Sequence, residues 1–177
     1  NLYQPKNLSI LEIGFGTGLN AFLTALDVQT QGLEIDYEGL EAYPVLEDEL
    51  SQLNYASLIG ANQQLVFDTL HQIPWQESHP ISSHFSLKKR QQFFNELEDE
   101  NVFDLIYFDA FGARVQPELW TEAIFKRMFK ALKNKGVLVT YSAKGSVRRA
   151  MQAVGFVVER LEGPPGKREM LRASKPA

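Results

Sequence analysis

The sequence predicts an α/β fold in which a mainly parallel sheet is covered by helices on both faces and ends in an antiparallel hairpin. Short apolar runs alternate with segments of helical periodicity along most of the 177 residues, which is the pattern of parallel strands joined by crossover helices. A glycine-rich turn follows the first apolar run, and two strand-like segments flank a Gly-Pro-Pro-Gly turn near the C-terminus. A chain of this length is expected to form one domain.

The first quarter of the chain contains two strands and two helices. Residues 9–13 (SILEI) form a short buried strand that ends at Gly14. Residues 19–28 continue as a helix, because their apolar side chains recur every three or four positions. Residues 33–40 form a second strand with apolar and acidic faces; since a parallel strand covered on both faces is apolar throughout, its acidic face is uncovered or its register differs. Pro44 precedes a second, short helix.

The next fifty residues carry weaker signals. Residues 65–67 and 84–87 are short strand candidates, and residues 93–99 favour an acidic helix. Pro74 and Pro80 separate these segments.

The second half of the chain is easier to assign. A strongly apolar strand over 102–108 is closed by Asp109. The helix after it runs from 117 to 133, with Pro117 in its first turn and an apolar stripe that places Trp120 in the core. The remaining elements are a turn at 134–136, a strand at 137–141, a helix at 146–154 and hairpin strands at 156–161 and 169–173.

Composition excludes several classes of protein. No run of about 18 apolar residues is present, so no membrane span is expected. The absence of cysteine excludes disulfides and thiolate metal sites, and the three histidines lack a metal-ligand pattern, so no metal is expected. The chain begins with Asn1 instead of Met, and we expect an N-terminal segment to be missing.

Charge is distributed unevenly along the chain. The formal net charge is −4, but residues 126–177 hold 13 of the 18 basic residues and only 3 of the 22 acidic ones. Such asymmetry indicates a face that binds a polyanion. Basic helices with solvated outer faces would give the same count, so both interpretations stand.

The glycine-rich turn predicts a nucleotide-like ligand without phosphate. Glycine permits positive φ and leaves room for ligand atoms beside the backbone. The dinucleotide fingerprint G-x-G-x-x-G is not met, because its third glycine position is Leu19. The sequence E-x-G-x-G-x-G, followed by carboxylates, suits S-adenosyl-L-methionine (SAM), which carries cationic groups and a ribose. A nicotinamide cofactor or a tight turn without ligand are the alternatives.

Two acidic residues are placed to meet this turn. Ligands of α/β sheets bind beyond the carboxyl ends of the strands, so the turn, Glu41 and Asp109 should converge at one rim. Glu41 follows the second strand and is the candidate acceptor for ribose hydroxyls. Asp36 and Glu38 are weaker candidates that face solvent instead.

Three stretches of the sequence together resemble the methyltransferase domain of the MnmC tRNA-modification family. Residues 12–20 (EIGFGTGLN) resemble the first motif of class I SAM-dependent methyltransferases and are generic by themselves. More specific are DAF at 109–111 followed by QPELWT at 116–121, and a tail with GSVRR at 145–149 and GKREML at 166–171. The likeness spans nearly the whole chain.

The resemblance implies a fold, an activity and a place in the cell. The fold is a Rossmann-like class I methyltransferase with a mostly parallel seven-stranded sheet and a C-terminal antiparallel hairpin. The activity is methylation of the primary amine of 5-aminomethyl-(2-thio)uridine at the tRNA wobble position, in the cytoplasm. Some relatives are fused to an FAD-dependent oxidase that acts earlier; we expect residues 1–177 to be a single methyltransferase domain without it, leaving a separate oxidase as partner.

The resemblance also assigns residues to the cofactor. SAM binding falls to Glu12, Gly14, Phe15, Gly16, Gly18, Asn20, Glu41 and Asp109. Many enzymes of this class hold the adenine amino group with a Gly-Asp pair after the third strand, but the corresponding stretch here reads KRQQF at 89–93. The amide of Gln92, or of its neighbour Gln91, is the candidate replacement.

The catalytic and substrate-binding residues follow from the chemistry of an amine acceptor. Asp109 is the candidate base that accepts the released proton, although it could cap a turn. Phe111 and Tyr141 are candidates for stacking on a flipped uracil, with core packing as the alternative. Candidate phosphate-binding residues, any of which could be plain surface, are Arg114, Lys144, Arg148, Arg149, Lys167 and Arg168.

Two other functions remain open. The protein could methylate a small-molecule or protein amine, or act like an aminopropyltransferase, as the acidic overall balance favours. It could also be a non-catalytic module that binds RNA or SAM.

Overall fold

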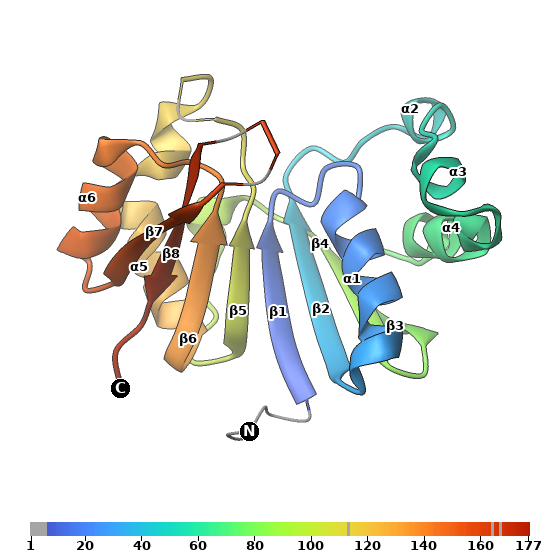
Figure 1. Ribbon diagram of the computed structural model, residues 1–177, viewed down its shortest axis with the longest axis horizontal. Coiled ribbons are helices and arrows are strands. Elements are labelled where there is room, and N and C mark those ends of the chain that lie inside the picture. The colour runs from blue at the N-terminus through green and yellow to red at the C-terminus, as the bar shows by residue number, and fades with distance from the viewer. Residues whose placement is uncertain (1–6, 113, 164, 167) are drawn as a thin grey trace.

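Eight strands form a single sheet in the computed structural model, which describes residues 7–112, 114–163, 165–166 and 168–177 (Figure 1). Their order is β3-β4-β2-β1-β5-β6-β8-β7. Five strands are parallel: β1 (Asn7–Ile13), β2 (Glu34–Glu41), β4 (Phe85–Gln91), β5 (Phe103–Phe108) and β6 (Leu132–Thr140). At the C-terminus, β8 (Glu169–Ser174) pairs antiparallel with both β6 and β7 (Val157–Glu162).

The predicted fold class is confirmed, and the sheet has one strand more than expected within the described residues. The extra strand is β3 (Ser78–Ser82), which pairs antiparallel with β4 at the edge of the sheet. It contains Pro80, and proline is compatible with an edge strand because its missing N–H need not face a neighbour. That proline, and a register shift beside it, concealed the strand in the sequence.

Helices cover the two faces of the sheet over different strands (Figure 1). The helices α1 (Leu19–Gln31) and α4 (Gln64–Gln72) pack on the face that carries Ile10 and Tyr37, whereas α5 (Glu122–Ala131) and α6 (Gly145–Ala153) pack on the face that carries Leu11. Shorter elements are α2 (Glu47–Leu50), α3 (Tyr55–Ile59), η1 (Ala61–Gln63), η2 (Phe94–Glu96) and η3 (Pro117–Trp120). In the described part of the chain, no helix is long and apolar enough to cross a membrane.

Three predicted elements differ from the structure. Residues 65–67 were predicted as a strand but lie in α4, where Phe67 and Leu70 share a buried face at helical spacing. The predicted acidic helix at 93–99 is only the single turn η2. The predicted helix 117–133 divides into η3 and α5, and β6 already begins at Leu132; the turn expected at 134–136 lies inside β6, where Lys135 has a φ of 66° and the register shifts.

The acidic face of β2 is open to solvent, as its alternating pattern predicts. Asp36 is exposed there and accepts a hydrogen bond from Ser86 of β4 at 2.6 Å. Arg90 of β4 forms ion pairs with Glu38 at 3.0 Å and with Asp99 at 2.9 Å. Cross-strand polar pairs therefore occupy the surface that a covering helix would otherwise bury.

Candidate functional site

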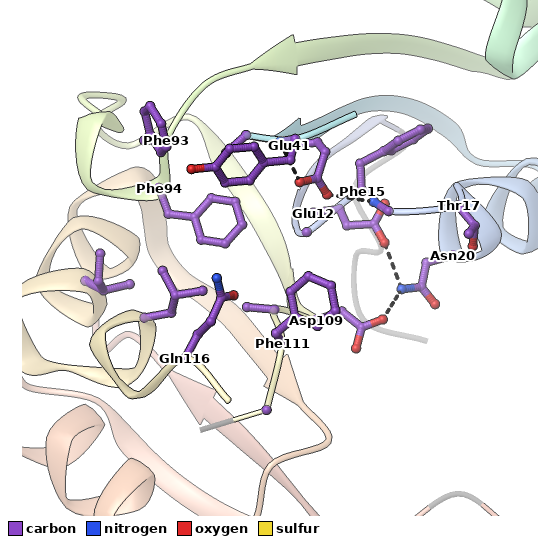
Figure 2. Close-up of a pocket in the computed structure, with 18 of the residues that line it drawn as sticks. Glu12, Phe15, Thr17, Asn20, Glu41, Phe93, Phe94, Asp109, Phe111 and Gln116 are labelled. Carbon is purple, nitrogen blue, oxygen red and sulfur yellow. Dashed lines mark hydrogen bonds between the residues drawn. The ribbon is translucent and has the colours of Figure 1, made fainter. Parts of the chain in front are cut away.

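A cavity of about 1060 Å³ opens at the carboxyl ends of the five parallel strands (Figure 2). Its lining comes from the ends of β1, β2, β4, β5 and β6 and the segments that follow them, so residues distant in sequence meet at one rim, as predicted. The volume is at the upper end of the roughly 300–1,000 Å³ typical of small-molecule sites. Among the predicted residues that line it are Glu12, Gly14, Phe15, Gly16, Asn20, Glu41, Asp109, Phe111 and Tyr141.

The glycines of the turn after β1 are required for different reasons. A Cβ at Gly14 would lie 2.9 Å from the backbone oxygen of Asp109, so glycine lets the end of β5 pack against the turn. Gly16 has a φ of +50° and open space where its side chain would be, which leaves its backbone accessible from the cavity. Gly18 does not line the cavity; a Cβ there would meet the rings of Phe15 and His71.

Phe15 supports the turn from below. Its ring is 3% exposed and makes edge contacts with His71 and Trp75. The ring occupies the space above Gly39 of β2, where any Cβ would collide with it. Phe15 therefore holds the turn on the sheet, and Gly39 belongs to the site although the sequence analysis missed it.

A hydrogen-bonded chain joins two carboxyl groups of the rim. The amide nitrogen of Asn20 donates to Glu12 Oε1 at 2.8 Å and to Asp109 Oδ2 at 2.9 Å (Figure 2). The hydroxyl of Tyr37 donates to Glu12 Oε2 at 2.9 Å. The pKa of Glu12 is raised to about 8, mainly by burial and also by the nearby carboxylates of Asp109 and Glu41, while the two hydrogen bonds act to lower it.

Glu41 closes the turn from the neighbouring strand. Its Oε2 accepts a hydrogen bond from the N–H of Gly16 at 3.0 Å, and its Oε1 accepts one from the N–H of Tyr43 at 3.0 Å. Each carboxylate oxygen can accept a second hydrogen bond. Glu41 thus fixes the glycine turn and retains the capacity to accept hydroxyl groups from a ligand.

The structure does not bring Gln92 into the cavity, which corrects its predicted cofactor role. Its side-chain nitrogen donates to the carbonyl of Glu96 at 2.8 Å, and its side-chain oxygen accepts from Arg90. Exposed Gln91 also lies outside the lining. The polar residue that does line the cavity after β4 is Asn95, which lies beyond the stretch at 89–93 from which the adenine contact was predicted.

The segment after β5 forms the opposite wall. Asp109 and Phe111 are exposed, the latter at 70%, and both line the cavity. Tyr141 donates its hydroxyl hydrogen to the carbonyl of Ala110 at 2.8 Å, and burial raises the pKa of this phenol. Trp120 is 6% exposed, which agrees with its predicted core position.

The predicted basic residues lie outside the lining of the cavity. Lys144 precedes α6, and exposed Arg149 lies within it; exposed Arg114 follows β5, and exposed Arg168 belongs to the β7–β8 connection. In Figure 1 this connection lies at the same end of the sheet as the carboxyl ends of β5 and β6. Lys167 lies outside the described residues.

The groups around the cavity fit SAM. Glu41 and Asp109 supply negative charge for a sulfonium and an ammonium group, and buried Glu12 holds Asn20 beside them. The space beside Gly16 admits ligand atoms to the backbone, and the aromatic wall of Tyr43, Phe93 and Phe94 suits an adenine ring.

Comparisons with known proteins point to the same chemistry. A family described as S-adenosyl-L-methionine-dependent methyltransferase matches residues 76–176. The tRNA 5-methylaminomethyl-2-thiouridine biosynthesis bifunctional protein MnmC of Actinobacillus pleuropneumoniae (serotype 5b) is 30% identical, covering 98% of this chain and 28% of that protein. The protein of the same description from Nitrosospira multiformis is 31% identical, covering 98% of this chain and 29% of that protein.

A solved structure agrees in its fold. The crystal structure of MNMC2 from Aquifex aeolicus is 25% identical in sequence and superposes with a TM-score of 0.76, covering 98% of this chain and 56% of that chain. The chain therefore spans less than a third of the length of these curated relatives and little more than half of the solved chain.

Proposed function

Because the chain belongs to the family of S-adenosyl-L-methionine-dependent methyltransferases, we propose that it methylates 5-aminomethyl-(2-thio)uridine at the wobble position of tRNA. The product is the 5-methylaminomethyl form. The observation that carries the proposal is similarity along 98% of this chain to proteins of tRNA 5-methylaminomethyl-2-thiouridine biosynthesis. Residues 1–177 act as one methyltransferase domain in the cytoplasm, and an FAD-dependent oxidase acts earlier in the same modification.

The cavity residues bind and orient the methyl donor. SAM supplies a methyl group that its positively charged sulfur makes electrophilic. Glu41 accepts the ribose hydroxyls, and Asn95 offers an amide to the adenine edge. Glu12 and Asp109, joined through Asn20, face the cationic end of the ligand. Fixing the donor in this way contributes through alignment, which can supply roughly 7–11 kcal/mol in well-oriented systems.

Asp109 handles the proton of the acceptor. An alkylamine has a pKa near 10 in water, so it arrives as an ammonium and must lose a proton before its lone pair can react. The carboxylate of Asp109 lines the cavity and accepts this proton, and Asn20 holds its Oδ2 at 2.9 Å. The hydrogen bond from Asn20 fixes the orientation of the Asp109 carboxylate.

The basic C-terminal part carries the affinity for tRNA. Lys144 just before α6 and Arg149 on α6 contact phosphates around the anticodon loop, together with Arg114, Lys167 and Arg168. Phe111 stacks on the uracil when the base leaves the loop.

The proposal is tested by incubating the purified protein with labelled SAM and tRNA from cells that lack this gene. Mass spectrometry of the nucleosides should show 5-aminomethyl-uridines converted to the methylated form, while polyamines and bulk protein stay unlabelled. Label in a polyamine or in protein would favour the small-molecule or protein alternative, and bound SAM without transfer to any acceptor would favour a non-catalytic module.

The role of Asp109 is tested with Asp109→Asn. We expect the rate of methyl transfer at saturating SAM to fall about 100-fold or more, because the general base is lost. Asp27→Asn, an exposed α1 position that does not line the cavity, is the matched control. An Asp109→Asn rate equal to that of the control contradicts the assignment.

A further inference from the structure

The side-chain amide of Gln116 lies in the cavity and has no role in the donor binding or proton transfer described above. It precedes η3, is half-buried, and lines the cavity on the wall formed by the segment after β5. Its backbone N–H donates to the carbonyl of Gly112 at 3.2 Å. Within the described residues no hydrogen bond involves its side-chain amide, and Figure 2 shows this amide pointing into the cavity.

The segment that carries Gln116 is held in place by its neighbours. The indole N–H of Trp120 donates to the carbonyl of Phe111 at 2.8 Å, and Trp120 itself packs on Phe108 and Tyr141. Hydrogen bonds from Trp120 and Tyr141 hold the carbonyls of Phe111 and Ala110, while the ring of Phe111 is exposed. The aromatic ring of Phe111 and the primary amide of Gln116 thus line the same cavity, after Asp109 in the sequence.

This pair of groups matches the requirements of a base. An exposed aromatic ring stacks on a nucleobase, and an amide with one donor and one acceptor side reads its hydrogen-bonding edge. Uracil presents an acceptor at O4 beside a donor at N3–H, which complements the amide of glutamine in two parallel hydrogen bonds. The C5 substituent lies next to C4, so an amide at the O4 edge leaves the aminomethyl group beside it.

Resting on the proposed function, we infer that Gln116 reads the O4 and N3–H edge of the target uracil while Phe111 stacks on its face. Gln116 is thereby a specificity-determining residue of the acceptor site. The 2-thio group replaces O2 and leaves the O4/N3 edge unchanged, so the same contact serves both the thiolated and the unthiolated uridine.

The test uses anticodon stem-loop RNA that carries 5-aminomethyluridine, and the same RNA with a methyl group on N3 of that base. For the wild type, we expect kcat/KM on the N3-methylated RNA to be about 10- to 100-fold lower, since the contact to N3–H is blocked and a polar group is left unpaired. Gln116→Met keeps the length of the side chain and removes the amide. It should lower kcat/KM on the normal RNA by a similar factor and abolish the difference between the two RNAs.

The controls separate a specific contact from damage to the fold. Gln31→Met, at the exposed end of α1 on the opposite rim, should behave as the wild type. The dissociation constant of SAM, measured by calorimetry, should be the same for Gln116→Met and the wild type; a weakened SAM complex would mean that Gln116 contacts the donor, and would overturn the inference.

The outcomes also separate this inference from the function on which it rests. A wild type that methylates neither RNA nor tRNA refutes the proposed function. A wild type that is active, paired with a Gln116→Met variant that still discriminates against N3-methylation, refutes the role of Gln116 alone.

Discussion

The raised pKa of Glu12 makes the stability of this protein depend on pH in a defined direction. Glu12 is 1% exposed, and burial moves the pKa of its carboxyl group from 4.5 to about 8. The folded protein therefore holds this proton more tightly than the unfolded chain. Between pH 4.5 and 8 the folded state binds more protons at this site, so stability falls as pH rises through this range and levels off above it.

The size of the effect follows from the two pKa values. One pKa unit corresponds to about 1.4 kcal/mol, so a change from 4.5 to about 8 corresponds to about 5 kcal/mol between acid and alkaline conditions. This is comparable to the whole stability of an ordinary domain, about 5–15 kcal/mol. Glu12→Gln keeps the shape of the side chain and cannot ionise, so the variant should escape this loss.

The assay is urea unfolding of the wild type and Glu12→Gln at several pH values from 5 to 9, without SAM. Groups that titrate in both proteins, such as His71 and Lys89, contribute equally to the two free energies of unfolding and cancel when one is subtracted from the other. We expect the variant to gain about 4 kcal/mol on the wild type as pH rises from 5 to 9, because part of the full change already lies below pH 5. A difference in the free energy of unfolding that stays constant over this range would refute the reasoning, because Glu12 would then ionise equally in both states.

Three further substitutions test other parts of the site. Gly14→Ala places a Cβ 2.9 Å from the backbone oxygen of Asp109, at a residue with a φ of +90°. We expect the variant to lose about 1–3 kcal/mol of stability in urea unfolding and to bind SAM much more weakly in calorimetry. An unchanged SAM affinity would contradict the packing argument. Asn20→Leu removes the donor shared by Glu12 and Asp109, and single-turnover methyl transfer should slow about 10- to 100-fold; an unaltered rate would show that the chain of hydrogen bonds does not orient Asp109. Arg149→Gln should weaken tRNA binding in low salt and reduce the slope of log affinity against log salt by about 0.7–0.9, and an unchanged slope would exclude a phosphate contact at this position.

The sequence predicted the arrangement of the site better than its individual polar contacts. Glu41 and Asp109 could be placed at one rim from the position of each after an apolar run, because parallel strands end at the same edge of a sheet. Gln92 was misplaced, since a strand boundary alone does not show which way the following side chains turn. Asn95 and Gln116 carry no periodic signal, because a single amide in an irregular segment looks the same whether it faces solvent or a cavity.

The fold was predictable where hydrophobic periodicity was strong and failed where it was short. The apolar run before Asp109 became β5 within one residue of its predicted start. Residues 65–67 gave too few positions to tell a strand from a buried helical face, and Pro80 hid the edge strand β3. These failures lie outside the cavity lining, so they did not disturb the prediction of where the site lies.

The ring of Phe15 lies against Gly39, so a residue of the turn after β1 and a residue of β2 constrain each other's size. A larger side chain at residue 39 requires a smaller one at residue 15, because both would occupy the same small volume under the turn. Among related sequences we expect positions 15 and 39 to covary. A residue larger than glycine at position 39 should coincide with a side chain smaller than phenylalanine at position 15.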